Sequence, residues 1–300
     1  MTAPISVTDG VVSLRDGSPS WARVIVRGQA AGTVSIGVGP TGSAADLAAL
    51  NWQLTSNDPV GEHAFRTVQL LLHHLATRTT VHTACVQLAD SDERTRVVAS
   101  RAGFADAGRT GHQRLLRRAV PPVTYTDGVV CIRRQRVEDI DAHLAGIDDE
   151  QIDWLWEPGS RPLWEALTPK EQRARSSAYL RGVHDSFGGG PKWTFSVDGA
   201  DAEYIAYVDC DLANNHAPAG QANISYTCHP AYRGQGNVSR AVRLIMRFLG
   251  EHTGAAQAHI IVDEQNAASL RVARAVGGAE AERFRNEHGR TMIRHVLPVR

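Results

Sequence analysis

The 300-residue sequence lacks a net charge and lacks any long apolar run. Lys plus Arg number 32 and Asp plus Glu number 32, so a global basic field that could hold nucleic acid is missing. No run approaches the ~18 apolar residues of a membrane helix, and residues 1–30 show no signal-peptide pattern. We therefore expect no nucleic-acid or membrane partner and a soluble, cytoplasmic protein, either a monomer or a homodimer.

Cysteine is scarce, and histidine lacks the spacing of a metal site. The four cysteines, Cys85, Cys131, Cys210 and Cys228, form no CxxC pair, so their spacing supports neither a disulfide framework nor a zinc site. The thirteen histidines include no HExxH motif. We predict that the protein holds no metal.

The sequence does contain an internal repeat. Residues 65–75 (FRTVQLLLHHL) and 239–249 (SRAVRLIMRFL) both place apolar residues at helical spacing. The step of 174 positions from Arg66 to Arg240 pairs similar residues without a gap across a stretch of about forty residues. This register indicates a duplicated domain.

Each copy is predicted to run helix, buried strand, helix and then further strands. The second copy has these elements at 236–252, 257–263, 267–276 and from there to Arg300. The first copy has them at 62–77, 82–88, 92–102 and 104–119. Upstream of each first helix we predict a strand that ends in proline, at 33–40 and at 223–230. The pattern indicates an α/β protein with mixed sheets.

The two copies are separated by a linker near 117–128, where Pro121 and Pro122 interrupt regular structure. We therefore predict one domain over residues 1–120 and a second over residues 123–300.

The first copy departs from the second upstream of its helix. Pro230 precedes Val242 by 12 positions, whereas Pro40 precedes Val68 by 28, which we interpret as an insertion. The first copy also has too few residues before its strands for the strand and two helices that open the second. We expect the first domain to be truncated and degenerate.

The most informative segment is 228–249, in which a strand is followed by Arg233-Gly234-Gln235-Gly236 and a long helix. Glycines permit a sharp turn, and a helix N-terminus offers unpaired N–H groups and a partial positive charge to a phosphate. Arg233 adds a full positive charge. The segment matches neither the P-loop nor GxGxxG. By itself it is equally compatible with a helix-entry turn that binds nothing.

The segment resembles the acyl-CoA-binding signature of the GCN5-related N-acetyltransferases (GNAT family), Arg/Gln-x-x-Gly-x-Gly/Ala. Arg233 and Gly236 match this signature, and Val238 departs from its last position. Residues 230–234 also match the family's common Pro-x-Tyr-Arg-Gly. Residues 266–273, NAASLRVA, resemble the family's Asn-x-x-Ser/Ala helix, although Asn266 is also a good helix N-cap.

The resemblance implies two tandem GNAT folds in a mycothiol-synthase-like layout, with acetyl-CoA as cofactor. The residues expected to hold it are Thr227, Cys228, Arg233, Gly234, Gln235, Gly236, Asn237, Val238, Asn266 and Ser269. The first domain is not expected to bind coenzyme A productively, because its turn is lost to the insertion. Asp92 and Thr95 stand there in place of Asn266 and Ser269.

The family transfers the acetyl group directly from the thioester to an amine. The resemblance implies that a backbone N–H near Thr227 and Cys228 stabilises the oxyanion. An acyl-enzyme on Cys228 is the alternative, but no partnering His-Asp pattern supports it. The family's usual acid, a tyrosine seven residues after the motif asparagine, is replaced by Ala273. Tyr226 is a candidate substitute, with His229 and His288 as weaker candidates, and water is the alternative.

The general base is also displaced from its usual position. Many family members carry glutamate where this chain has Asn223, which cannot take a proton. Asp209 and Asp211 lie on the predicted third strand, 203–213, and alternation places both on one face with Tyr207. Either could be the base. The alternative is an exposed strand end.

Ten acidic residues lie between Glu138 and Glu171, among three tryptophans. Carboxylates and indole faces suit a cationic ligand, and Asp153, Trp156 and Glu157 are the expected contacts. The alternative is a solvated helix face with tryptophans in the core. We predict N-acetylation of a small polycationic amine, an antibiotic or peptide-like metabolite, as a resistance step. Thiol biosynthesis of the mycothiol type and a non-enzymatic acyl-CoA-binding module are the alternatives.

Overall fold

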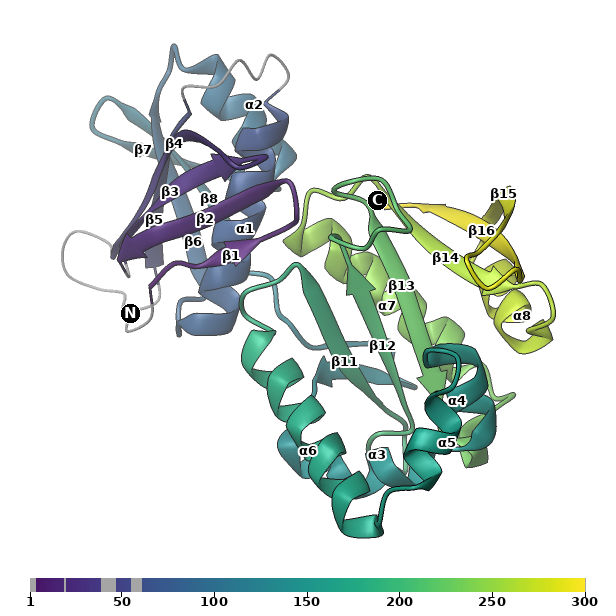
Figure 1. Ribbon diagram of the computed structural model, residues 1–300. Coiled ribbons are helices and arrows are strands. Elements are labelled where there is room, and N and C mark those ends of the chain that lie inside the picture. The colour runs from purple at the N-terminus through teal and green to yellow at the C-terminus, as the bar shows by residue number, and fades with distance from the viewer. Residues whose placement is uncertain (1–3, 19, 39–46, 55–60, 300) are drawn as a thin grey trace. The chain divides into compact units, whose positions relative to one another are not determined.

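The computed structural model describes residues 4–18, 20–38, 47–54 and 61–299. The chain comprises two compact units, each with most of its residue contacts within itself (Figure 1). The first comprises Met1–Val123, Gly188–Pro191 and Leu249–Gly254, and the second comprises Thr124–Phe187, Lys192–Phe248 and Ala255–Arg300. Among the described residues, no helix is long and apolar enough to cross a membrane.

The first unit contains an eight-stranded sheet in the order β1-β2-β3-β4-β5-β6-β8-β7. Its strands are β1 (Val7–Thr8), β2 (Val12–Ser18), β3 (Trp21–Val26), β4 (Gln29–Val38), β5 (Leu47–Leu54), β6 (Thr83–Ala89), β7 (Ala105–Thr110) and β8 (Gln113–Ala119). Its helices are α1 (Glu62–Arg78) and α2 (Glu93–Arg101). The described pairings are antiparallel except between β5 and β6.

The second unit also contains an eight-stranded sheet. Its strands are β9 (Tyr125–Thr126), β10 (Cys131–Arg134), β11 (Lys192–Asp198), β12 (Ala206–Asp211), β13 (Ala222–Cys228), β14 (Gln257–Asp263), β15 (Ala279–Arg285) and β16 (Thr291–Pro298). Its helices are η1 (Val137–Asp139), α3 (Ile140–Gly146), α4 (Asp149–Leu155), α5 (Ser160–Glu165), α6 (Pro169–Ser186), η2 (Pro230–Tyr232), α7 (Asn237–His252) and α8 (Ala267–Ala275).

The two sheets have the same topology. Read from β9, the second sheet runs β9-β10-β11-β12-β13-β14-β16-β15, which matches the first strand for strand. In each sheet a parallel pair, β5–β6 or β13–β14, is joined through a long helix, α1 or α7. The predicted α/β class and tandem folds are confirmed, and the predicted strand 257–263 coincides with β14.

The predicted insertion in the first copy is wrong. The strand before α1 is β5, which lies inside the supposed insertion and pairs in parallel with β6, as β13 does with β14. The predicted strand at 33–40 corresponds to β4, whose counterpart is β12, and its last two residues lie outside the described part. Because β5 (LAALNWQL) buries only two of its eight residues, its apolar pattern is weak, and Pro40 is not the counterpart of Pro230.

With β5 in place, the step of 174 positions runs without a gap from β5 to α2. Residues 55–62 (TSNDPVGE) therefore stand where the second unit has residues 229–236 (HPAYRGQG). Residues 55–60 lie outside the described residues. The first copy differs from the second in the composition of this segment and not in its length.

The units differ most in the connection between the second and third strands of each sheet. The first unit turns directly from β2 to β3, with Ser18 paired to Trp21. The second unit places η1, α3, α4, α5 and α6 between β10 and β11. The prediction that the first copy lacks the opening helices is right for the described residues. The prediction that it lacks the opening strand is wrong, because β2 holds the place of β10 in the sheet order.

The core of the second unit is aromatic. Trp193 and Phe195 from β11 pack edge-on against Phe248 of α7, with ring centroids 5.6 and 4.9 Å apart, and all three are fully buried. Buried aromatic rings contribute large apolar areas to stability. This packing anchors α7 to the sheet, and so positions the turn that precedes the helix.

Candidate active site

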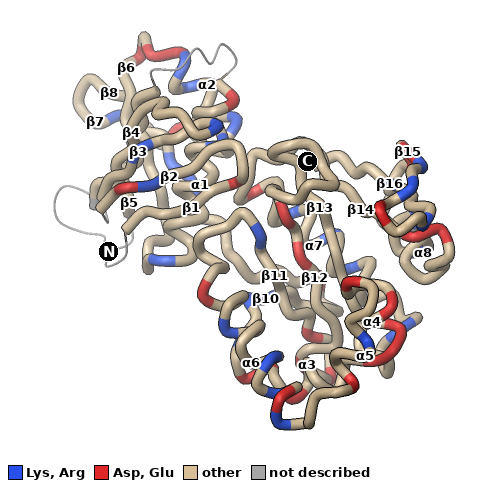
Figure 2. Tube along the Cα trace, in the orientation of Figure 1, with Lys and Arg blue, Asp and Glu red and all other residues tan. Residues whose placement is uncertain are grey.

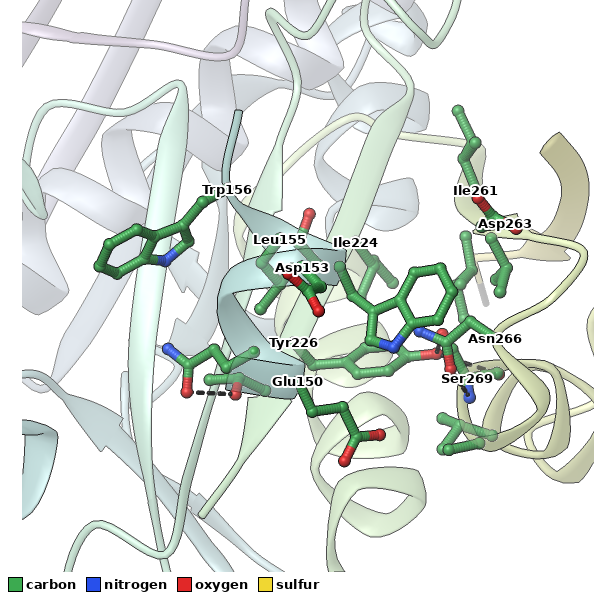
Figure 3. A pocket seen from close by; sticks show the side chains of 18 of the residues that line it. Glu150, Asp153, Leu155, Trp156, Ile224, Tyr226, Ile261, Asp263, Asn266 and Ser269 are labelled. Atoms are coloured by element: carbon green, nitrogen blue, oxygen red, sulfur yellow. Dashed lines mark hydrogen bonds between the residues drawn. The ribbon is translucent and has the colours of Figure 1, made fainter. Parts of the chain in front are cut away.

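A wedge opens between the two parallel strands of the second unit. The ladder between β13 and β14 comprises only the pairs Ala222–Ala258 and Asn223–His259, at the beginning of both strands. Their outer neighbours, β12 and β16, stay paired along the strands. A cavity of about 1650 Å³ occupies this region, and its wall includes Ile224 and Ile260. Elements that line it include α4, the turn before α7, α8 and the β15–β16 hairpin (Figure 3).

The glycine turn lines one end of the cavity. Gly234 and Gly236 have φ of +77° and +79°, in the left-handed region that glycine adopts without strain. A Cβ at either residue would meet no atom within 4 Å, so the backbone conformation and not space requires glycine here. α7 begins at Asn237, and the first N–H groups of a helix have no intrahelical partner. Gly234, Gly236, Asn237 and Val238 line the cavity. Gln235 does not line it.

The Arg233 side chain is engaged with carboxylates. Its Nη1 lies 2.8 Å from Asp148 Oδ2 and 2.5 Å from Glu150 Oε2, and its Nη2 donates to Asp148 Oδ1 at 2.8 Å. Its Nε donates to the Cys228 carbonyl at 3.2 Å. The full positive charge that the sequence places at the turn is therefore matched by two negative charges.

Asn266, Ser269 and Tyr226 meet on the α8 side of the cavity (Figure 3). Asn266 is the N-cap of α8, and its Oδ1 accepts from the Ser269 N–H at 2.9 Å. The Tyr226 hydroxyl lies 2.7 Å from Ser269 Oγ and donates to the Ser269 carbonyl at 3.2 Å. Burial raises the pKa of Tyr226 to about 12, so the phenol is protonated at neutral pH. Sequence reasoning did not foresee this contact.

Thr227 and Cys228 line the cavity at the open end of β13. Thr227 Oγ1 donates to Gln151 Oε1 of α4 at 3.0 Å. Burial raises the pKa of the Cys228 thiol to about 11, against the weaker opposing effect of Arg233. A thiol this weakly acidic is a poor nucleophile at neutral pH, which argues against the acyl-enzyme alternative.

Asp209 and Asp211 share a face of the sheet, as the register pairs Tyr207 with Thr227, Asp209 with Ser225 and Asp211 with Asn223. Neither carboxylate lines the cavity, although Ser225, directly opposite Asp209, does. Asp209 is 3% exposed. Its burial raises the pKa of the carboxyl to about 6, against the opposing charge of Lys192, whose Nζ lies 3.5 Å away. The Asp211 carboxylate accepts from the Ala213 N–H at 2.9 Å.

The predicted substrate residues Asp153, Trp156 and Glu157 all line the cavity. Lys and Arg lie among the acidic positions around α4 and α5 (Figure 2). Arg161 binds Asp149 at 2.7 Å and Asp153 at 2.5 Å. The acidic count of this region therefore overstates its unpaired negative charge. Trp156 packs edge-on against Trp164, with centroids 5.2 Å apart.

Arg290, on the β15–β16 hairpin, also lines the cavity and was missed by sequence reasoning. Its guanidinium lies 5.8 Å from the centre of the Trp154 ring and 3.7 Å from Asp263 Oδ2, and its Nη1 donates to the Asp153 carbonyl at 3.5 Å. No local pattern connects the hairpin with α4. Of the weaker acid candidates, His288 lines the cavity and His229 lies outside its wall.

The wedge and the helix-entry turn together place an anion site beside an open strand, as an acyl-CoA-dependent acyltransferase requires. A family model described as an acetyltransferase (GNAT) domain matches residues 130–279, half of the chain, and the chain belongs to this family. Acetyl-CoA is therefore its cofactor. Among the described residues, no group of three His, Cys, Asp or Glu side chains could hold a metal ion.

A search of curated proteins found no match. Solved structures that resemble the chain include a GNAT acetyltransferase from Bacillus anthracis, with 13% identity, a TM-score of 0.46, and coverage of 58% of this chain and 98% of the other. Mycobacterium smegmatis RimJ in complex with CoA-disulfide has 18% identity, a TM-score of 0.47, and coverage of 57% and 82%. The microcin C7 self-immunity acetyltransferase MccE, in complex with acetyl-CoA and AMP, has 11% identity, a TM-score of 0.43, and coverage of 58% and 94%.

Proposed function

We propose that the chain is an N-acetyltransferase that transfers the acetyl group from acetyl-CoA directly to a primary amine of a small cationic molecule. The catalytic domain is the second one, over residues 123–300. The observation that supports this most is the wedge between β13 and β14, which shares one cavity with the glycine turn and the start of α7.

Backbone amides form the proposed cofactor site. The N–H groups from Gly234 to Val238 would hold the pyrophosphate, because the left-handed glycines and the start of α7 leave them without backbone partners among the described residues. The Arg233 N–H, by contrast, donates to the Pro230 carbonyl at 3.4 Å. Thr227 and Cys228 border the wedge where the thioester would lie, and their backbone N–H groups are the candidates for stabilising the oxyanion. Asn266 and Ser269 would contact the pantetheine arm.

Two groups would move the protons. Asp209 would take the amine proton through water at Ser225, since its raised pKa of about 6 leaves it mostly ionised at pH 7 and still basic enough to accept a proton. Asp211 is the alternative base. Tyr226 is protonated at neutral pH and lies on the cavity wall, so it is the candidate acid for the departing thiolate.

The acceptor would be a small polycationic molecule, such as an antibiotic or a peptide-like metabolite, whose acetylation removes one positive charge. Trp156 offers an indole ring and Glu157 a carboxylate in the cavity wall. Because Arg161 binds Asp149 and Asp153, Glu157 would carry more of the cation recognition than Asp153 does.

The first domain, residues 1–120, would not bind the cofactor productively. By the common register, Glu62 stands at the position of Gly236, in the first turn of α1. Its carboxylate binds Arg66 at 3.0 Å and Arg101 at 2.7 Å. A phosphate at this helix N-terminus would meet a negative side chain.

Thiol release from acetyl-CoA, measured with a panel of aminoglycosides, polyamines and basic peptides, tests the proposal. We expect turnover with at least one amine and an acetamide in the product. The Glu62→Gln variant, changed only in the first domain, should keep the same rate. Tight acetyl-CoA binding by calorimetry without turnover on any amine would refute the enzyme and favour an acyl-CoA-binding module.

A further inference from the structure

Helix α4 lies between the two ends of the cavity. Asp148 and Glu150, at its start, meet Arg233 of the glycine turn, while Asp153 and Trp154, near its end, line the cavity wall. Resting on the function proposed above, we propose that the Arg233 side chain positions α4 for the acceptor amine and is not a ligand of the cofactor phosphates.

The contacts of Arg233 leave few of its N–H groups free to bind a phosphate. The guanidinium meets both oxygens of Asp148 at 2.8 Å, a bidentate contact. Glu150 lies 2.5 Å from Nη1, and the Cys228 carbonyl takes Nε. A phosphate would therefore compete with two carboxylates for the Arg233 guanidinium.

The same contacts fix the first turn of α4. Asp148 is the N-cap of the helix and its Oδ1 accepts from the Gln151 N–H at 2.9 Å, while Gln151 Oε1 accepts from Thr227 of β13. The start of α4 is thus joined to β13 through Gln151 and to the glycine turn through Arg233.

The position of the far end of α4 depends on these contacts at its start. The helix has seven residues, too few to be stable without tertiary contacts. Leu155, its last residue, is 38% exposed. Two arginines contact the helix independently of Arg233. Arg161 pairs with Asp149 and Asp153, and Arg290 lies 3.5 Å from the Asp153 carbonyl and 5.8 Å from the Trp154 ring centre. Loss of the Arg233 contacts should therefore loosen the cavity wall that faces the acceptor.

Charge supports the same division of roles. Asp148, Glu150 and Arg233 carry one net negative charge beside the glycine turn, so they do not attract phosphates as a group. Backbone amides would hold the pyrophosphate without them. Neutralising the two carboxylates should therefore change acetyl-CoA binding little, whereas replacing Arg233 would weaken that binding strongly only if its guanidinium held a phosphate.

The test compares Arg233→Gln with the double variant Asp148→Asn/Glu150→Gln. Asn keeps the capping oxygen of Asp148, so the double variant removes charge without removing the cap. In both we expect the KM for the best amine of the panel to rise about three- to tenfold, the scale of a partly exposed bidentate ion pair. The Kd for acetyl-CoA by calorimetry should rise less than about twofold.

Hydrogen exchange of the α4 amides, residues 149–155, gives a readout that does not need an amine, and it should become faster in both variants. Arg173→Gln, which breaks the exposed pair with Asp141 away from the cavity, is the matched control and should change none of these values. A tenfold loss of acetyl-CoA affinity in Arg233→Gln, with unchanged exchange in α4, would make Arg233 a phosphate ligand and overturn the proposal. If no amine is acetylated, the proposed function fails, while exchange and calorimetry still decide the role of Arg233.

Discussion

Replacing Asp209 by Asn measures how much free energy of unfolding the second unit loses by burying a carboxylate in its sheet. The Asp209 side chain is 5% exposed, and the side chain of Lys192, whose Nζ lies 3.5 Å from Asp209 Oδ2, is half exposed to water. Its Oδ1 has no hydrogen-bond partner among the described residues. Desolvation therefore outweighs the attraction of Lys192, and the pKa rises from 3.8 to about 6.

The raised pKa gives the size and the sign of the effect. A shift of about two pKa units corresponds to about 3 kcal/mol in the free energy of unfolding. Because the folded state binds the proton more tightly, this stability is present below about pH 4 and is lost as the pH rises through about 6. At pH 4 the Asp209→Asn variant should therefore unfold at about the same denaturant concentration as the parent. At pH 7 it should be more stable than the parent by up to about 3 kcal/mol.

Guanidinium unfolding followed by tryptophan fluorescence at pH 4 and pH 7 gives the two free energies. Glu138→Gln, at an exposed position, removes a negative charge without removing a buried one and is the control. If the difference between Asp209→Asn and the parent is the same at both pH values, the burial argument is wrong.

The same variant tests the proposed base. If Asp209 accepts the amine proton, Asp209→Asn should lower kcat by about a hundredfold or more and remove the rise in rate near pH 6. Unchanged turnover would eliminate Asp209 and direct attention to Asp211→Asn.

Three further changes test the cofactor site and the acid. Gly236→Ala at φ near +79° costs about 1–2 kcal/mol, and we expect the turn of the free variant to relax to avoid this cost. Restoring the turn on binding should then raise the Kd for acetyl-CoA by up to about five- to thirtyfold, and an unchanged Kd by calorimetry would argue against the turn. Tyr226→Phe should lower kcat and leave that Kd unchanged, and full activity would leave water as the acid. Cys228→Ala should retain turnover, whereas a complete loss would revive the acyl-enzyme.

The elements with a strong local signal could be predicted from the sequence. α7 alternates apolar and polar residues at helical spacing, and α8 begins at an asparagine whose side chain caps it, as expected. β5 could not be placed because only Ala48 and Leu50 are buried along its eight residues. Its identity depends on its pairing with β6, which is a property of the sheet and not of the strand.

The candidate site likewise contains residues that could be predicted from the sequence and residues that could not. The glycines of the turn are recognisable because left-handed backbone restricts the residue type. The partners of Arg233 are not, since Asp148 and Glu150 lie more than eighty positions upstream and could equally have been solvated. Arg290 is a similar case, because its contact with α4 joins two segments 137 positions apart.

The two sheets suggest where function resides in this chain. Pairing of β5 with β6 stops at Ala49–Cys85, and pairing of β13 with β14 stops at Asn223–His259, which are equivalent positions in the common register. Asp92 caps α2 with the same bond that Asn266 makes in α8. The wedge and the cap are therefore properties of the duplicated fold, whatever each copy binds. Besides the helices between β10 and β11, the second copy differs in the segment of about eight residues before α7. There Gly236 stands in place of the acidic Glu62 and leaves the amides of the proposed cofactor site open to an anion.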